Sequence, residues 1–148
     1  MNWLDCFAQI CKIPHPSKHE AALAAWLKHQ AETAGLVVRT DAKGNLAIDR
    51  RASRGYEDRP TIILQAHMDM VPQVRPGFVF DFERDPVPWR IDGDWIHTDG
   101  KTTLGADNGI AVALMMEMLL DPALKTGPLR GLFTVEEEIG LNGAAEAD

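Results

Sequence analysis

The hydrophobic and polar positions along the chain follow two kinds of spacing. Apolar residues recur every three or four positions in some stretches, which is typical of amphipathic helices. Other stretches are short, continuous apolar runs, which are typical of buried strands. The pattern predicts helices at 3–12, 21–35 and 109–121, strands on both sides of a turn at 43–45, strands at 61–67 and 127–135, and a hairpin at 89–97 that turns near residues 92–93.

Helices alternate with strands along the chain, which indicates a layered α/β fold. A chain of 148 residues is long enough for one domain with a sizeable core. Ser17 and Glu20 form an S-x-x-E motif before the second helix, so we predict a capping box at its start. The run at 61–67 is apolar throughout, so we predict a strand that is covered on both faces.

Charge and cysteine content narrow the function classes. The net charge is −7, from 22 acidic and 15 basic residues, which argues against broad binding to nucleic acids or anionic membranes. No apolar run approaches the roughly 20 residues needed to span a bilayer, and the N-terminus does not resemble a signal peptide. Cys6 and Cys11 are five positions apart in one predicted helix, a spacing that does not favour a disulfide. We therefore expect a cytoplasmic protein with two free thiols.

Chemically reactive residues follow the predicted strands or open the next helix at three places. His67 and Asp69 come at the end of the strand at 61–67 and point to one side of an extended segment. Asp107 stands between two glycines directly before the apolar helix. Three acidic residues, 136–138, follow the strand at 127–135, where packed carboxylates repel one another unless a cation compensates.

Each of these places also has a simpler interpretation. His67 and Asp69 could merely end a strand, Asp107 or Asn108 could be a helix N-cap, and the acidic run could be a solvated turn. The three together favour a shared site, because sites in open α/β sheets gather at the carboxyl ends of strands. One imidazole with several carboxylates suits zinc or a harder divalent ion. A carboxylate can bridge two such ions, and a further glutamate can act as a general base.

Three motifs, "QAHMD", "TTLGADNG" and "EEEIGLNGA", occur in the order that resembles the M20 class of metallopeptidases. Within that class the chain is most similar to the aminoacyl-histidine dipeptidases, also called cytosol non-specific dipeptidases. The stretches "CKIPHPSKHE" and "DFERDPVPWRIDGDWI" carry the same likeness. The resemblance implies a three-layer, mixed-sheet catalytic domain of the zinc-peptidase type, with two divalent ions, most simply zinc, although manganese or cobalt would also fit.

The resemblance also implies a role for each candidate residue. His67 would bind one metal ion, Asp107 would bridge both, and Asp69 would be the catalytic-site aspartate that supports the cluster. Ile139 and Gly140 set the register of the glutamate pair. Glu137 would then be the general base and Glu138 a ligand of the second metal ion, while Glu136 falls outside the pattern. A cis peptide bond is implied after the bridging acid, between Asp107 and Asn108.

Residues 1–148 correspond to the N-terminal part of such a catalytic domain. The family also uses a further acidic ligand, a late histidine and a separate lid domain, which this sequence does not contain. We expect His15, His19, His29 and His97 to be ordinary surface or cap residues rather than the late ligand. The implied full-length protein is a homodimer that cleaves Xaa-His dipeptides, and the chain alone is expected to be inactive. The alternatives are another hydrolase of the class (a tripeptidase, a carboxypeptidase or an N-acyl-amino-acid hydrolase) and a non-catalytic module that binds a metal or a partner.

Overall fold

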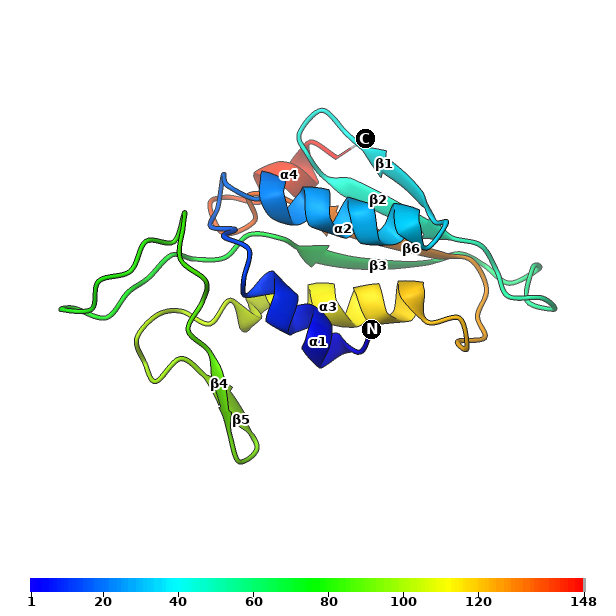
Figure 1. Ribbon diagram of the computed structural model, residues 1–148. Helices are drawn as coiled ribbons and strands as arrows, with labels where there is room; N and C mark the ends of the chain where they lie inside the picture. The colour runs from blue at the N-terminus through cyan, green and yellow to red at the C-terminus, as the bar shows by residue number, and fades with distance from the viewer. Residues whose placement is uncertain (148) are drawn as a thin grey trace.

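The computed structural model describes residues 1–147, which form a four-stranded mixed sheet packed against helices and a separate two-stranded hairpin (Figure 1). The elements in chain order are α1 (Trp3–Ile10), α2 (Ala21–Thr33), β1 (Val37–Thr40), β2 (Leu46–Arg50), β3 (Ile62–His67), β4 (Arg90–Asp92), β5 (Trp95–His97), α3 (Ala106–Leu120), β6 (Leu129–Thr134) and α4 (Asn142–Ala145). The order, type and approximate bounds of the elements predicted from the sequence are therefore confirmed.

The main sheet has the strand order β1-β2-β6-β3. β2 pairs antiparallel with β1 and β6, whereas β3 pairs parallel with β6. A parallel pair needs a crossover connection, and the segment that contains α3 makes it. The carboxyl ends of β3 and β6 therefore lie side by side, with His67 opposite Thr134. The carboxyl ends of β3 and β6, near the start of α3, are on the left in Figure 1.

The core lies on one face of the sheet. Leu46, Ile48, Leu129 and Phe133 are buried there, and α2 and α3 cover β1–β2 and β3–β6 respectively. α1 packs on α3, where Phe7 is fully buried. The mixed α/β sheet is thus as predicted, but residues 1–147 supply two layers of the implied three. Successive side chains of a strand point to opposite faces of the sheet, so every second residue of these strands lies on the other face.

The prediction that β3 is covered on both faces is wrong for this chain. Ile62 and Ile63 are 50% and 60% exposed: Ile63 lies beside Arg130 on the face that no helix of residues 1–147 covers, and β3 is also the last strand of the sheet. Only the carboxyl end of the strand, Ala66 and His67, is buried. An apolar run shows that a strand has surfaces to bury, but it does not show where the covering elements come from.

The predicted capping box is also wrong. α2 begins at Ala21 after Glu20, and no side chain caps its first turn. Ser17 instead donates a hydrogen bond to Asp69 Oδ2 (2.7 Å), and Glu20 Oε1 accepts from the backbone N–H groups of Lys18 and Glu136. Both side chains of the motif therefore have a long-range partner, and the one local bond of Glu20, to the Lys18 N–H, does not cap the first turn of α2.

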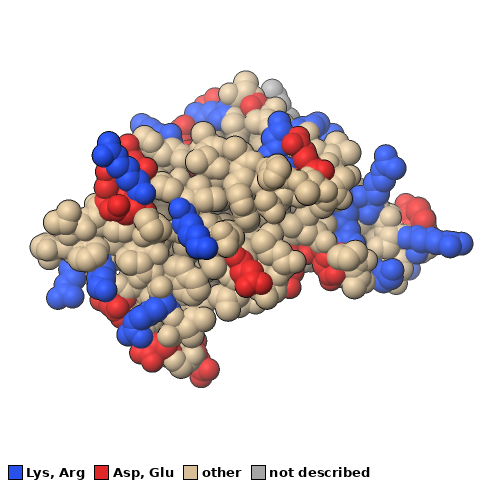
Figure 2. All heavy atoms as spheres, in the orientation of Figure 1, with Lys and Arg blue, Asp and Glu red and all other residues tan. Residues whose placement is uncertain are grey.

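Basic and acidic side chains are interspersed on the face shown in Figure 2, without a large patch of one sign. None of the helices formed by residues 1–147 is long and apolar enough to cross a membrane. Cys6 and Cys11 are both free, as predicted, and both are buried. Burial raises the pKa of each thiol to about 12, so both are neutral at physiological pH.

The turn after β6 is held by a buried polar network around Asn45. The Asn45 amide donates to the Gly143 carbonyl (2.9 Å) and to Asp41 Oδ2 (2.7 Å), and its oxygen accepts from Val135 N–H (3.0 Å). A Cβ atom added at Gly143 would stand only 2.1 Å from the Val135 carbonyl oxygen. The backbone of α4 therefore lies against the end of β6 at a distance that only glycine permits.

We expect Gly143→Ala to destabilise the chain by about 3 kcal/mol or more, because the clash is with backbone atoms that cannot rotate away. The measurement is the free energy of unfolding in urea. Gly100→Ala is the matched control, since Gly100 has a positive φ but open space around its Cβ position, and about 1–2 kcal/mol is expected there. Equal losses in the two variants would contradict the proposed close packing at Gly143.

Candidate metal centre

Three segments that are distant in sequence meet beyond the carboxyl ends of β3 and β6. His67 is the last residue of β3, Asp107 lies at the start of α3, and Glu137 and Glu138 follow β6. The structure therefore brings all five candidate residues, Asp69 included, into one cluster. Parallel pairing of β3 with β6 is the cause, because it places the residues that follow both strands at the same end of the sheet.

The start of α3 has an unusual backbone that lifts Asp107 out of the helix. Gly105 has φ +72°, and a Cβ atom there would lie 3.0 Å from the sulfur of Met70. Asp107 and Asn108 have non-helical angles, and the peptide bond between them is cis, as the family resemblance implied. Asp107 is thus not a helix N-cap, and its side chain is 83% exposed at the mouth of the site.

The two nitrogens of the His67 ring have different environments. Nδ1 lies 3.0 Å from the Asp69 carbonyl oxygen and 3.4 Å from Asp69 Oδ1, so it carries a proton that it donates to that residue. Nε2 points outward and lies 3.0 Å from Asp107 Oδ1 and 3.8 Å from Glu137 Oε2. The His67 side chain is only 6% exposed, so little of the ring other than its outward edge can reach solvent.

Asp69 connects the parts of the site and has no exposed side-chain surface. Its Oδ1 accepts from the backbone N–H of Glu137 (2.9 Å), and its Oδ2 accepts from the N–H of Glu138 (3.1 Å) and from the Ser17 hydroxyl (2.7 Å). Burial opposes its ionisation, but the hydrogen bonds from His67, Ser17 and the two amides hold the pKa of Asp69 well below its usual range. Asp69 is therefore a fixed negative charge beside the imidazole.

The acidic run divides between two sides of the turn. The Glu136 carboxylate points to Lys43 Nζ (3.4 Å) and accepts from the Asn142 amide. Glu137 and Glu138 face the other side, toward His67 and Asp107. Glu136 therefore lies on the opposite side of the turn from the other two glutamates. A left-handed φ of +53° at Glu136 produces the change of side.

The pKa values reflect the crowding of charge. Burial lowers the pKa of His67, but its contacts with Asp69 and Asp107 raise it to about 9 overall. Partial burial raises the pKa of Glu138, the charge of His67 lowers it, and the carboxylates of Asp107, Glu137 and Asp69 raise it, with a net rise. A cation among these groups would relieve the carboxylate repulsion that raises the pKa of Glu138.

The residues fit a divalent cation. One ligand atom each from His67, Asp107 and Glu138 lies within 4.8 Å of the other two. Two ligand atoms that share one tetrahedral zinc ion at about 2.1 Å stand about 3.4 Å apart, so the 3.0 Å between His67 Nε2 and Asp107 Oδ1 would need to widen by only about 0.4 Å. The bond from Nδ1 to the Asp69 carbonyl fixes the tautomer that leaves Nε2 free to bind a metal.

The other histidines lie outside this cluster. His19, His29 and His97 have exposed or half-buried positions, as predicted, and His19 and His97 lie near acidic side chains. The prediction of a surface position is wrong for His15, which is 3% exposed and bonds through Nδ1 to the Ile13 carbonyl. Its backbone carbonyl accepts from Met70 N–H, so the segment before α2 packs against the segment that follows β3.

Sequence reasoning did not identify Ser17 or Glu20 as contacts of this site. The available signal was the S-x-x-E spacing, which was assigned to helix capping. The spacing alone cannot distinguish a helix cap from two side chains that reach a distant turn.

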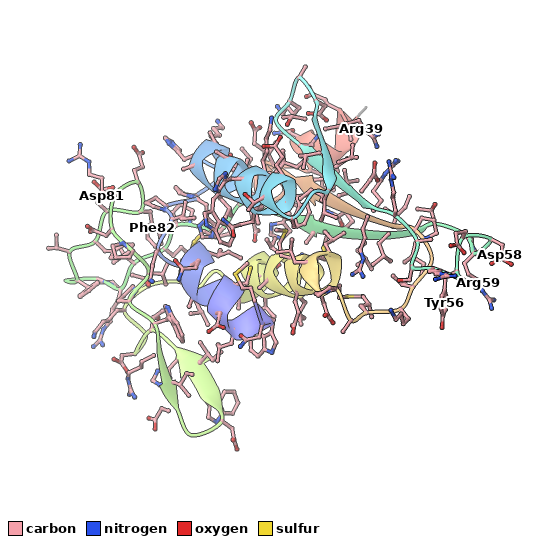
Figure 3. The ribbon with its side chains drawn as sticks, turned by 45° about the vertical axis from the view of Figure 1, so that its right-hand side comes forward. Arg39, Tyr56, Asp58, Arg59, Asp81 and Phe82 are labelled. Carbon is pink, nitrogen blue, oxygen red and sulfur yellow. The ribbon has the colours of Figure 1, made fainter. Side chains whose placement is uncertain are left out.

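The loops at the far end of the sheet, with Tyr56, Asp58 and Arg59, lie opposite to Asp81 and Phe82, which belong to the site end (Figure 3).

No protein-family model matches the chain. Among curated proteins, it is 47% identical over 140 residues to a cytosol non-specific dipeptidase from Escherichia coli, an alignment that covers 95% of this chain and 29% of that protein. It superposes on the crystal structure of an aminoacylhistidine dipeptidase from Vibrio alginolyticus with a TM-score of 0.94 and 43% identity, over 99% of this chain and 30% of that one.

A more distant structure shares the fold at a TM-score of 0.57 and 18% identity, over 95% of this chain and 40% of that one. It is a Bacillus subtilis protein described as a dinuclear metal-binding peptidase from the M20 family. The chain thus spans less than a third of the length of the dipeptidases that it matches, and it corresponds to their N-terminal part.

Proposed function

We propose that this chain, which belongs to the M20-class metallopeptidases and matches the N-terminal part of their dipeptidases, provides most of a two-metal centre for peptide hydrolysis. The observation that carries the proposal is the convergence of His67, Asp107 and Glu138 within 4.8 Å, with the Glu137 carboxylate beside them. In this assignment His67 binds one ion, Asp107 bridges two, and Glu138 binds the second.

Two divalent ions are the proposed cofactors, and zinc fits the imidazole and carboxylate set best, with manganese or cobalt as alternatives. In such a centre a divalent ion would supply Lewis acidity, which lowers the pKa of water toward neutral pH and polarises a carbonyl oxygen. Three protein ligands shared by two ions leave coordination positions for water and substrate, and for ligands from a longer polypeptide.

Glu137 is the proposed general base. Its carboxylate is one-third exposed and lies 3.8 Å from His67 Nε2, so it faces the space between the proposed ligands. There it accepts a proton from water as the new carbon–oxygen bond forms, and it then delivers that proton to the leaving amine nitrogen as the carbon–nitrogen bond breaks. Asp69 assists as a fixed, ionised group that orients His67 and the Glu137 backbone.

Short peptides, and Xaa-His dipeptides in particular, are the proposed substrates. The names of the two dipeptidase relatives support this substrate class. The same relatives support a cytoplasmic location, and the resemblance noted in the sequence supports a homodimer for the full-length protein. Substrate pockets and dimer contacts would then come mostly from the two-thirds of the relatives that this chain does not match.

We expect the purified 148-residue chain to bind zinc weakly and to show no measurable Xaa-His hydrolysis, because three ligands leave two ions under-coordinated. A chimera in which residues 1–148 replace the matching N-terminal part of the E. coli dipeptidase is expected to be active and to contain two metal ions per chain. Mass spectrometry gives the metal content, and release of free histidine gives the rate.

Related experiments separate the alternatives. Most of the chimera's substrate pocket comes from its E. coli part, so a different hydrolase of the class is tested on a longer polypeptide that carries residues 1–148, assayed with tripeptides, peptides with a free carboxyl end and N-acyl amino acids. A chimera that holds metal without turnover would favour the non-catalytic module. Measurable Xaa-His cleavage by the 148-residue chain alone would contradict the prediction that it is inactive.

A further inference from the structure

The segment between α1 and α2 reaches the candidate metal centre through two polar side chains. Ser17 Oγ donates to Asp69 Oδ2 at 2.7 Å, and Glu20 Oε1 accepts from the Glu136 backbone N–H at 3.0 Å. Glu20 is 5% exposed, and within residues 1–147 it forms no ion pair with a basic side chain. A carboxylate is costly to bury unless hydrogen bonds satisfy it, so the Glu20 carboxylate favours the position of the turn in which the Glu136 N–H reaches it.

Three consecutive backbone N–H groups of the turn, at residues 136–138, donate to the buried carboxylates of Glu20 and Asp69. The N–H of Glu136 is bound by Glu20, the N–H of Glu137 by Asp69 Oδ1 and the N–H of Glu138 by Asp69 Oδ2. Glu136 has φ +53°, which is unfavourable for a residue with a side chain and must be compensated by its surroundings. These three bonds therefore determine where the two glutamate side chains point.

Ser17 acts on the same turn through Asp69. With His67 and two amides also bound, the Asp69 carboxylate has one fixed orientation, and the hydroxyl of Ser17 holds its Oδ2 from the outer side. Without that bond the carboxylate could rotate, and the amides of Glu137 and Glu138 would lose their geometry together. Groups that orient metal ligands in this way typically affect metal affinity by about 10- to 100-fold.

We propose that Ser17 and Glu20 are positioning residues of the metal centre, which hold the turn that carries the general base and the second metal ligand. The proposal rests on the proposed function, because it assigns Glu137 and Glu138 their roles. It also explains the S-x-x-E spacing without helix capping: Ser17 donates to Asp69, which binds the turn, and Glu20 accepts from the Glu136 N–H of the turn itself.

The test uses the 148-residue chain labelled with ¹⁵N, in four variants: Ser17→Ala, Ser17→Thr, Glu20→Ala and Glu20→Gln. Zinc titrations followed by amide chemical shifts give the affinity, and hydrogen exchange reports on the amides of residues 136–138. We expect Ser17→Ala and Glu20→Ala each to weaken zinc binding by about 10- to 100-fold. Exchange should quicken about tenfold, at Glu137 and Glu138 for Ser17→Ala and at Glu136 for Glu20→Ala.

The conservative variants make the test specific. Ser17→Thr keeps the hydroxyl and Glu20→Gln keeps an acceptor oxygen, so both should restore near-normal zinc affinity and exchange. Ser53→Ala is the matched control for Ser17, because the Ser53 hydroxyl bonds the Leu124 carbonyl near the other end of the sheet. Glu117→Gln is the matched control for Glu20, because Glu117 accepts from the Trp3 N–H away from the site.

Unchanged zinc affinity in Ser17→Ala and Glu20→Ala would overturn the proposal, whether or not exchange changed, since a merely structural role would leave the affinity intact. Failure of the conservative variants to restore affinity would overturn it too, in chains shown by urea unfolding to be folded. A wild-type chain that binds no zinc at His67 and Glu138 would overturn the proposed function itself, and the wild-type titration separates that result from the others.

Discussion

Glu137→Gln in the chimera is expected to lower the rate of Xaa-His hydrolysis by at least about 10²- to 10⁴-fold, the usual contribution of a general base. Both metal ions should remain bound, because the amide has the size of the carboxylate and Glu137 is not a proposed ligand. The Glu137 backbone bond to Asp69 involves its N–H, which the substitution does not alter. The combination of full metal content and lost turnover is the specific expectation.

The measurement is histidine release at saturating substrate, with metal content determined on the same preparation. Glu136→Gln is the matched control: it is the adjacent glutamate, but its carboxylate pairs with Lys43 at 3.4 Å on the other side of the turn. It should retain nearly the full rate. A full rate in Glu137→Gln would show that the base assignment is wrong. If Glu138→Gln instead lost turnover with full metal content, the register would be shifted by one residue.

Asp107→Ala is expected to remove both the bound metal and the activity. As the proposed bridge it supplies a ligand to each ion, so its loss leaves His67 and Glu138 without a shared anion between them. The fold should survive, because the side chain is 83% exposed and its direct contact is with His67 Nε2 at 3.0 Å. Metal content and histidine release should therefore both be lost, whereas the urea concentration at the midpoint of unfolding should stay near that of the unmodified chimera.

Asp121→Ala is the matched control for Asp107→Ala, since Asp121 follows the opposite end of α3 and, among residues 1–147, its carboxylate accepts only from the nearby Ala123 N–H. It should keep two metal ions per chain and the unmodified rate. Retention of two tightly bound ions in Asp107→Ala would contradict the bridging role. Loss of one ion only would assign Asp107 to a single metal.

Local sequence signals were sufficient for the elements whose structure is decided by near neighbours. The turn at Lys43–Asn45, the hairpin at Asp92–Gly93 and the apolar helix were predicted at nearly their observed places. Each depends on periodicity or on turn residues, which act over a few positions. The same holds for the free thiols of Cys6 and Cys11, because their spacing does not favour a disulfide.

Errors arose where a residue has a distant partner. His15 was expected at the surface, yet it is buried because the segment before α2 packs against the segment that follows β3. The S-x-x-E motif was assigned to helix capping, yet Ser17 contacts a residue 52 positions away and Glu20 one 116 positions away. β3 was predicted to be covered on both faces, yet it lies at the edge of the sheet in this chain.

The sequence by itself determined which side chains are available for chemistry, because His67, Asp107 and the glutamate pair each stand at a strand end or before a helix. The placement of the glycines could also be read directly, whereas the register of the glutamate pair is what the family resemblance implies. Only the tertiary structure decided that these groups face one another, since parallel pairing of β3 with β6 brings together residues about 70 positions apart, a distance over which spacing has no predictive value. It also decided that Asp69 binds the backbone of the glutamate turn, a contact made by main-chain N–H groups that every sequence contains.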